Sequence, residues 1–203
     1  MSDAPTSAPG QPETTDDLVR RACAGDLAAF NALVEAHQSL VFSLCLRMLG
    51  DASAAEDATQ EAFVSAWRAV ARLRGSFRPW LMRIAANACA DDMRRRRRRP
   101  ASSLDARSEG SDAAREAPDR APGPEEAALR TEQRRAIAAA LLELPADQRL
   151  AVVLADVHGF SYEEIAETTD ASLGTVKSRI ARGREKLRRL LVASGTIGSP
   201  GAS

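Results

Sequence analysis

The spacing of apolar residues along the chain predicts helices and no strands. From Asp16 onward, apolar positions recur three or four residues apart, which gathers them on one face of a helix. No stretch alternates between apolar and polar residues in the way of a half-buried strand. The pattern indicates a short helix, a longer one that ends at Gly50-Asp51, and two more before residue 99. The predicted fold class is all-α.

Three local signals indicate where helices begin. Ser53 and Glu56, and again Ser161 and Glu164, have the spacing of a capping box, in which the two side chains satisfy free backbone N–H groups. Pro79 is suited to a first helical turn, where its missing N–H group has no partner to lose. Helices are therefore expected to begin close to these three places.

The C-terminal part of the chain has the pattern of a helix-turn-helix. One helix ends at His158-Gly159, a short one opens at Ser161, and Ser172 can cap a third. Residues 143–170 hold seven acidic residues and one basic residue, whereas residues 171–190 hold seven basic residues and one acidic residue. A short turn between two helices, the second of them strongly basic, is typical of a DNA-binding unit whose second helix enters the major groove.

Composition divides the chain into two helical domains joined by a linker. Residues 100–128 contain four prolines and eight alanines, with Leu104 as their only large apolar residue. Such a segment buries too little apolar surface to offset the loss of chain entropy, so a flexible linker is predicted. The predicted parts are a disordered tail at 1–15, a first domain at 16–99, the linker at 100–128, a second domain at 129–192 and a disordered tail at 193–203.

Basic residues concentrate in two places although the chain as a whole is neutral. Its 28 Lys and Arg residues balance 28 Asp and Glu residues, yet Arg94–Arg99 is an unbroken run of six arginines and residues 171–190 are strongly basic. Since the helix dipole favours cations at a C-terminus, a solvated helix end is one interpretation of the arginine run. Six adjacent cations repel one another, however, and phosphates relieve that cost, so contact with a polyanion is the favoured interpretation.

The sequence lacks the patterns of a membrane span, a secretory signal and a catalytic centre. Its apolar runs are far shorter than the ~20 residues that a span requires, and residues 1–15 lack the basic start and apolar core of a signal. Three widely spaced cysteines favour a reducing cytoplasm over a disulfide framework or a zinc site. His37 and His158 are isolated and are interpreted as structural. We expect no enzyme activity, cofactor, metal site or membrane insertion.

A first motif resembles a known family of bacterial proteins. It comprises Ala55–Phe63, Trp67, Phe77–Asn87 and Asp92, which read AEDATQEAF, W, FRPWLMRIAAN and D. Together they closely resemble domain two of sigma factors of the small extracytoplasmic-function group. The resemblance implies a helical domain that docks on the clamp helices of the largest RNA polymerase subunit and reads the −10 promoter element while that element is melted.

A second motif looks like domain four of the same family. It comprises Tyr162–Ala166 and Val176–Leu187, which read YEEIA and VKSRIARGREKL. The resemblance implies a domain that reads the −35 element and holds the β-flap tip of the polymerase. Both motifs in this order across a linker are highly specific. The chain differs from the larger housekeeping sigma factors in having no domain between domains two and four. It also differs from many members at Ala181, where they carry a bulkier DNA-contacting side chain.

Three sets of candidate residues follow from the motifs and from positions on the predicted helices. Contacts with the −35 element are expected at the start of the basic third helix, from Ser172, Thr175, Lys177, Ser178, Arg179 and Arg182. Contacts that read and melt the −10 element are expected from a basic loop and the outer face of the helix after it, namely Arg72, Arg74, Ser76, Phe77, Arg78, Arg83, Asn87, Arg94 and Arg95. Polymerase docking is expected from Asp57, Gln60 and Glu61, for which a solvated helix face is the alternative.

Phe77 has two competing interpretations. It falls in the predicted basic loop at residues 72–78, where an aromatic side chain can form one wall of a pocket for a base extruded from the duplex. Members of the family capture an unstacked −10 base in this loop, so the resemblance implies the same role for Phe77. The alternative is a core residue, which is the interpretation given to Phe63, Trp67 and Trp80 because each lies on an apolar stripe.

The function expected from these observations is that of a transcription-initiation specificity subunit. Such a chain binds core RNA polymerase and promoter DNA, helps to open the −10 region, is cytoplasmic, and commonly has an anti-sigma partner. A flexible linker lets two weak DNA-reading domains act as one strong one through effective concentration. Two alternatives stay open, a stand-alone helix-turn-helix repressor and a pure interaction protein.

Overall fold

The computed structural model describes residues 13–98 and 124–198, so most of the predicted linker and tails lies outside the described residues. These two ranges, the N-terminal bundle and the C-terminal bundle, are helical and contain no strand, which confirms the all-α prediction. The N-terminal bundle consists of α1 (Thr15–Cys23), α2 (Leu27–Leu49), α3 (Ala52–Ala69), the 3-10 turn η1 (Val70–Arg72) and α4 (Phe77–Arg98). The C-terminal bundle consists of α5 (Pro124–Leu142), α6 (Ala146–Val152), the π-helical turn η2 (Val153–Val157), α7 (Tyr162–Thr169) and α8 (Leu173–Ala193).

Three of the predicted boundaries differ from the structure, the last of them at the C-terminal tail, where α8 includes Ala193 and Thr196 N–H bonds back to the carbonyl of Leu191. The N-terminal tail was expected to reach residue 15, but Thr14 caps α1 and accepts a bond from the backbone N–H of Asp17 at 3.2 Å. The linker was expected to reach residue 128, but α5 already begins at Pro124. Proline is well tolerated in a first helical turn, so the last proline of the predicted linker can be the first residue of α5.

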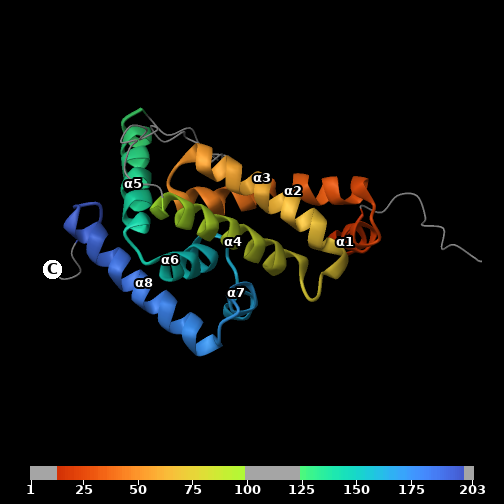
Figure 1. Cartoon of the computed structure of the whole chain (residues 1–203). Helices are drawn as coiled ribbons and strands as arrows, with labels where there is room; N and C mark the ends of the chain where they lie inside the picture. Colours follow the sequence, from red (N-terminus) through yellow and green to blue (C-terminus); the bar gives the residue numbers. More distant parts are fainter. Residues whose placement is uncertain (1–12, 99–123, 199–203) are drawn as a thin grey trace, which may run out of the picture.

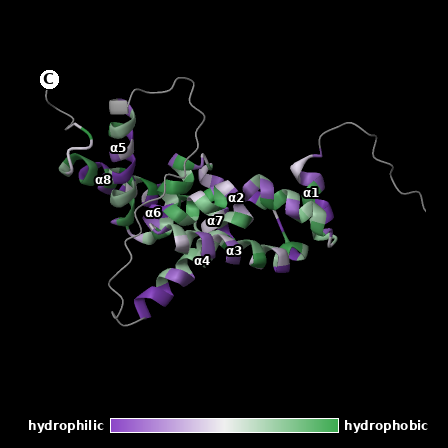
Figure 2. Cartoon of the chain, turned by 90° about the horizontal axis from the view of Figure 1, so that it is seen from above, coloured by the Kyte–Doolittle hydropathy of each residue, from purple (hydrophilic) through white to green (hydrophobic). Residues whose placement is uncertain are grey.

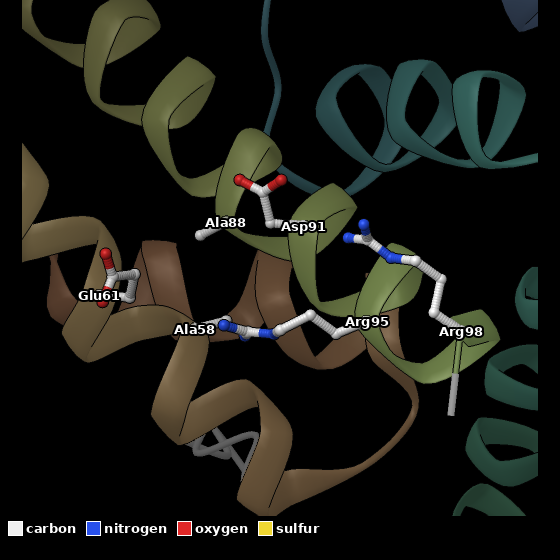
Figure 3. A pocket seen from close by; sticks show the side chains of 6 residues that line it. All are labelled: Ala58, Glu61, Ala88, Asp91, Arg95 and Arg98. Atoms are coloured by element: carbon white, nitrogen blue, oxygen red, sulfur yellow. The ribbon is translucent and has the colours of Figure 1, made fainter. Parts of the chain in front are cut away.

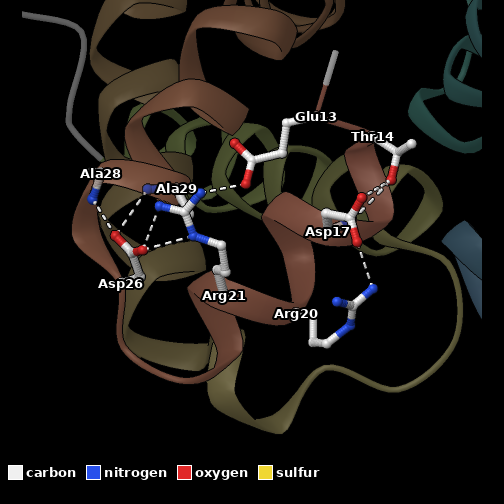
Figure 4. A network of polar contacts seen from close by, with 8 residues as sticks. All are labelled: Glu13, Thr14, Asp17, Arg20, Arg21, Asp26, Ala28 and Ala29. Carbon is white, nitrogen blue, oxygen red and sulfur yellow. Dashed lines mark hydrogen bonds and ion pairs between the residues drawn. The ribbon is translucent and has the colours of Figure 1, made fainter. Parts of the chain in front are cut away.

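A polar network fixes the corner between α1 and α2 (Figure 4). Asp26 caps α2 by accepting bonds from the backbone N–H groups of Ala28 and Ala29 at 2.9 and 3.1 Å. Arg21 of α1 binds the same carboxylate at 2.6 Å and also Glu13 at the start of the described chain. One side chain thus caps the second helix and ties it to the first.

Alanines rather than aromatic residues make the buried face of α3. Its buried positions are Ala54, Ala55, Ala58, Ala62 and Ala66, and the helix packs against α2 and α4. The distance between packed helices depends on the side chains at the contact, so this stripe lets α3 approach its neighbours closely. Phe63 and Trp67, which the sequence places on an apolar stripe, are half-buried at its edge.

The capping predictions are confirmed at two of three places. Ser161 and Glu164 form the predicted capping box of α7, and Ser172 caps α8. The predicted box at Ser53 is wrong, because α3 begins at Ala52 and is capped by Asp51, which accepts a bond from Ala54 N–H at 2.8 Å. Gly50 ends α2 in the left-handed region with a φ of 72°, and Asp51 then starts the next helix at once.

The two bundles pack against each other. In Figure 1, α7 lies below α4, and α5 and α6 lie beside the C-terminal end of α2. Arg149 of α6, which is 8% exposed, donates to the carbonyl oxygens of Leu142 and Leu144 at 2.5 and 3.1 Å and to that of Met48 in the N-terminal bundle. Burial lowers the pKa of Arg149, but three carbonyl partners hold its guanidinium in place.

One described helix, α2, passes the length and composition test for a membrane span. Its buried residues include Phe30, Leu33, Val41 and Leu44, and it packs against α1, α3 and α4. The central helix of a soluble bundle has the same composition, since it is apolar on every side that meets a neighbour. The buried face of α2 therefore accounts for part of its apolar character.

Candidate nucleic-acid interface

The C-terminal bundle contains the predicted helix-turn-helix. Within it, α7 and α8 are joined by a short turn in which Asp170 has a φ of 50°, the left-handed conformation that Asp tolerates better than most residues. Val176 and Ile180 of α8 are fully buried. A Cβ atom on Gly183 would lie 2.6 Å from Cγ2 of Val152, so α8 sits very close to α6 at that point.

Several cations of α8 hold the helix to its own bundle. Arg179 binds Asp147 of α6 at 3.0 Å, and Arg184 binds Asp156 of η2 at 2.5 and 3.0 Å. Asp156 also raises the pKa of Arg184. Lys186 donates to the carbonyl oxygen of Glu143 at 2.6 Å. Two ion pairs and one hydrogen bond to a carbonyl therefore join the basic stretch to the acidic stretch across the bundle.

The six predicted −35 residues divide into three groups. The side chains of Lys177 and Arg182 are exposed and make no ion pair or hydrogen bond with any other described residue. Arg179 is held by Asp147. The hydroxyl-bearing residues bond locally at the start of α8, where Ser172 and Thr175 are 2.9 Å apart and Ser178 donates to the carbonyl of Thr175.

The predicted basic loop of the N-terminal bundle is shorter than expected. Because η1 ends at Arg72 and α4 begins at Phe77, the connection consists of residues 73–76 only. Arg72, Arg74 and Ser76 are exposed there, and Gly75 takes a φ of 80°, which a side chain would oppose.

The structure places Phe77 in the core, so the prediction that it lines an open pocket is corrected. Phe77 is 7% exposed and opens α4 rather than lying in the loop. Its ring meets His37 edge-on at 5.3 Å and Trp80 at 5.8 Å between centroids. Burial of an aromatic ring is strongly favourable, and Arg78 next to it in the sequence does not oppose it because the guanidinium of Arg78 has its own partners, the carbonyl oxygen of His158 and the carboxylate of Glu164.

The outer-face prediction for α4 holds for three residues and fails for Arg83. Asn87, Arg94 and Arg95 are exposed. Arg83 instead donates to the carbonyl oxygen of Glu167 in α7, and its Nε atom is buried. Arg78, in the first turn of α4, also meets the C-terminal bundle, through the carbonyl oxygen of His158 at 2.7 Å and Glu164 at 3.7 Å.

The arginine run continues α4 as an exposed, hydrophilic helix end (Figure 2). Part of its charge is neutralised by neighbours, since Arg94 pairs with Asp91, Arg95 with Asp92, and Arg96 with both Asp92 and Asp51. Arg99 lies outside the described residues. Arg97 is exposed and forms no ion pair within the described chain.

A hollow of about 330 Å³ lies between α3 and α4 next to this helix end. Figure 3 shows Glu61 of α3 on one side and Arg95 and Arg98 of α4 on the other; Ala58, Ala88 and Asp91 complete the lining. The three predicted polymerase-docking residues, Asp57, Gln60 and Glu61, are exposed on the same outer face of α3. Carboxylates and guanidiniums thus share one polar surface.

Of two residues at the contact between the bundles, sequence reasoning did not single out Arg149 and interpreted His158 only as structural. Arg149 carries three hydrogen bonds there, and the one available signal was that it is the single basic residue in residues 143–170. Burial, together with Arg47 and Arg78, lowers the pKa of His158 to about 4. Within residues 13–98 and 124–198, no group of His, Cys, Asp and Glu is arranged to hold a metal ion.

Comparison with known proteins matches both motif regions. The Sigma-70 region 2 family matches residues 33–99, and the Sigma-70 region 4 family matches residues 134–187. The RNA polymerase sigma-H factor of Pseudomonas aeruginosa is 38% identical over 186 residues, which cover 88% of this chain and 94% of that protein. The chain belongs to the sigma-70 family. Its membership of the extracytoplasmic-function group follows from the ECF RNA polymerase sigma-E factor of Escherichia coli K12, 40% identical over 86% of this chain and 92% of that one.

Solved structures agree with the assignment of this chain to the sigma-70 family. The structure of CnrH in complex with the cytosolic domain of CnrY aligns with a TM-score of 0.64 and 29% identity, over 89% of this chain and 99% of that chain. The sigma factor RpoE in complex with the anti-sigma factor NepR, from Bartonella quintana, aligns with a TM-score of 0.59 at 24% identity and shows the shared fold. The resemblance inferred from the two motifs is therefore confirmed.

Proposed function

We propose that this sigma factor binds core RNA polymerase and directs it to promoters with separate −35 and −10 elements, where it assists melting of the −10 region. The observation that carries the proposal is a pair of exposed cations, Lys177 and Arg182, at the start of a helix whose other cations are occupied by its own bundle. These two side chains are available to base edges or phosphates in a major groove, whereas Arg179 is not without breaking its pair with Asp147.

Contact with the −10 element is assigned to the loop and the exposed part of α4. Arg72, Arg74 and Ser76 surround a glycine turn, and Asn87, Arg94 and Arg95 continue along the helix. Arg78 and Arg83 complete this set when the C-terminal bundle does not cover them. Phe77 is left out of the set because it is a core residue.

Polymerase docking is assigned to the outer face of α3, with Asp57, Gln60 and Glu61 on the clamp helices, and to the C-terminal bundle on the β-flap tip. In support, the relatives at 38–40% identity are named RNA polymerase sigma factors. The chain acts in the cytoplasm, where the polymerase is, and performs no catalysis itself. An anti-sigma factor is a further partner by analogy with the RpoE and NepR complex.

Run-off transcription tests the proposal directly. Core polymerase supplemented with this chain is expected to give discrete transcripts from sheared DNA of the source genome, and core polymerase alone is not. Mapping the start sites then defines the two promoter elements. Co-elution with core polymerase separates the proposal from its rivals, because a stand-alone repressor needs no polymerase and binds a palindrome as a dimer. A chain that binds promoter-like DNA without core polymerase and yields no transcript contradicts the proposal.

A further inference from the structure

One arginine in the first half of α8 is held by an aspartate of another helix of the same bundle. Nε of Arg179 lies 3.0 Å from Oδ2 of Asp147, which belongs to the first turn of α6. The side chain of Arg179 is 29% exposed, less than those of Arg184, Arg188 and Arg189, the other arginines of α8 that form ion pairs. Arg179 therefore lies against its own bundle instead of extending into solvent.

The position of Arg179 on α8 is suited to contact with a DNA phosphate. Arg179 comes four residues after Thr175 and three before Arg182, and residues with these spacings share one flank of a helix. Arg182 on this flank is exposed. When the start of such a helix enters a major groove, cations on its flanks reach the phosphates that border the groove. With Asp147 in place, the guanidinium of Arg179 is not offered to them.

Tight packing between α6 and α8 keeps the carboxylate of Asp147 close to Arg179. A Cβ atom on Gly183 would lie 2.6 Å from Cγ2 of Val152 and 3.3 Å from the carbonyl oxygen of Gln148, the residue after Asp147. The two helices are thus in direct contact at their backbones. The ion pair can therefore break by rotation of its two side chains, but not by a small separation of the helices.

A single hydrogen bond holds Arg179, in contrast to the other ion pair between α8 and the preceding elements. Arg184 binds both carboxylate oxygens of Asp156, at 3.0 and 2.5 Å. Arg179 bonds Asp147 through Nε alone, and its two terminal nitrogens have no hydrogen-bond or ion-pair partner among the described residues. Exposed ion pairs are weak, and a phosphate is a strong acceptor for a guanidinium. Loss of the Asp147 carboxylate would therefore free Arg179 for DNA at little cost to the fold.

We propose that Asp147 is a positioning residue that holds Arg179 off the DNA backbone, so that α8 meets DNA with Lys177 and Arg182 and not with its full set of cations. Phosphate contacts are independent of sequence, so withholding one of them lowers the affinity for every DNA alike. Contacts of Lys177 and Arg182 with base edges then form a larger share of the total. The inference rests on the assignment of the start of α8 to the −35 element in the proposed function.

Two substitutions that remove the same charge test the role of Asp147. Asp147→Asn removes the carboxylate that binds Arg179 and changes the shape of the side chain very little. Glu143→Gln, the matched control, removes a carboxylate from the same acidic stretch, but from an exposed side chain that forms no ion pair with a described residue. The backbone carbonyl of Glu143, which accepts the bond from Lys186, is unchanged in this variant. Thermal unfolding checks that both full-length variants remain folded.

Fluorescence anisotropy with a labelled DNA duplex of random sequence, over a series of salt concentrations, is the measurement. At low salt, Asp147→Asn should bind about 2- to 5-fold more tightly than Glu143→Gln. Its slope of log affinity against log salt concentration should also be steeper by about 0.9, because one more phosphate is neutralised. An ion pair that only stabilised the fold would lower the melting temperature of Asp147→Asn but would leave this slope unchanged.

A double variant shows whether Asp147 acts through Arg179. Asp147→Asn combined with Arg179→Gln should return the slope to that of Glu143→Gln. A steeper slope that persists in the double variant overturns the proposal, because Asp147 would then act on DNA directly. Equal slopes for Asp147→Asn and Glu143→Gln also overturn it, even with tighter binding, since Arg179 would then contact DNA in the wild-type chain as well. Weaker binding of Asp147→Asn would make the aspartate a support that aims Arg179 at DNA.

The outcomes separate this inference from the proposed function. A duplex of random sequence contains no defined promoter element, so the slopes do not depend on promoter recognition. Run-off transcription by the wild-type chain with core polymerase tests the proposed function independently. Transcripts together with equal slopes overturn the role of Asp147 alone, and a steeper slope without transcripts supports that role on a DNA-binding helix while it contradicts the sigma activity.

Discussion

The two basic helices, α4 and α8, use their cations in different ways. In α8, Arg179, Arg184 and Lys186 bind acidic residues or a carbonyl of the same bundle, and Lys177 and Arg182 are left exposed. In α4, the terminal arginines pair with aspartates one turn away, while Arg78 and Arg83 bind the other bundle. The two helices are similarly basic in sequence, but their cations fall into three groups. Some bind within their own helix or bundle, some bind the other bundle, and some are exposed.

That difference distinguishes the two surfaces that we propose contact DNA. Ion pairs within the C-terminal bundle hold α8 in place, so the backbone that carries its exposed cations keeps a fixed position. The N-terminal bundle has a firm core of alanines and aromatic residues, but part of its basic surface is covered by a segment distant in sequence. The surface of the C-terminal bundle is preorganised and exposed. The surface of the N-terminal bundle is also preorganised, but part of it is covered by the C-terminal bundle.

The largest expected effect concerns the aromatic residue at the start of α4. Phe77→Ala should lower the free energy of unfolding by about 3–5 kcal/mol, because it empties a site that is 7% exposed and removes ring contacts to His37 and Trp80. Urea unfolding followed by circular dichroism measures the change.

The matched control lies three residues earlier in the chain. Arg74→Ala, at an exposed loop position, should change the free energy of unfolding by less than about 0.5 kcal/mol. If Phe77→Ala proved as stable as Arg74→Ala, the ring would be free to leave the core, and the pocket that the sequence predicted for an extruded base would return as an explanation.

The next effect contrasts a free cation with a paired one on α8. Arg182→Ala should weaken binding to the −35 element by about 1–3 kcal/mol and alter its sequence preference if the contact is bidentate to guanine. Arg179→Ala should instead lower stability, because it removes the pair with Asp147, and leave the sequence preference unchanged. Binding to a library of double-stranded promoter variants separates the two; a uniform loss for Arg182→Ala would make it a phosphate contact.

The sequence was sufficient for the fold class, the helix-turn-helix and the caps at Ser161 and Ser172, because these depend on local spacing and hydrogen bonding. It was insufficient for Phe77 and Arg83, whose surroundings come from distant parts of the chain. His37 on α2 packs against Phe77, and Arg83 donates to the carbonyl oxygen of Glu167 on α7. No local sequence pattern indicates such a contact. The error at Ser53 has another origin, since Asp51 offered an equally good cap two residues earlier.

Acid pH should weaken the folded, closed chain through His158. Burial is the main cause that lowers the pKa of His158 from 6.5 to about 4, and the nearby cations Arg47 and Arg78 add to it. The stability that comes from a neutral His158 is therefore fully present above pH 6.5 and is lost as the pH falls from 6.5 toward 4. The loss should be about 1–2 kcal/mol, since the side chain is partly exposed and solvent screens the repulsion.

Comparison with a variant isolates this contribution from the carboxylates that titrate in the same range. Urea unfolding of wild type and His158→Gln between pH 7.5 and pH 4.5 is the measurement, and the difference between the two proteins is the quantity of interest. The wild-type chain should lose more stability than the variant on acidification. Parallel losses would show that His158 gains a proton without cost and that its surroundings are open to water.

The smallest effect compares two neighbouring arginines of the run at the end of α4. Arg97 is exposed and forms no ion pair with the described residues, whereas Arg96 is held by Asp92 and Asp51. A free cation that neutralises one phosphate contributes about 0.9 to the slope of log affinity against log salt concentration. Arg97→Gln should reduce the slope by that amount, and Arg96→Gln by clearly less, because its charge is already balanced by two carboxylates. Titrations of a promoter duplex at four salt concentrations give both slopes. Equal slopes for the two variants would mean that DNA displaces the aspartates, and an unchanged slope for Arg97→Gln would mean that the run points away from the phosphates.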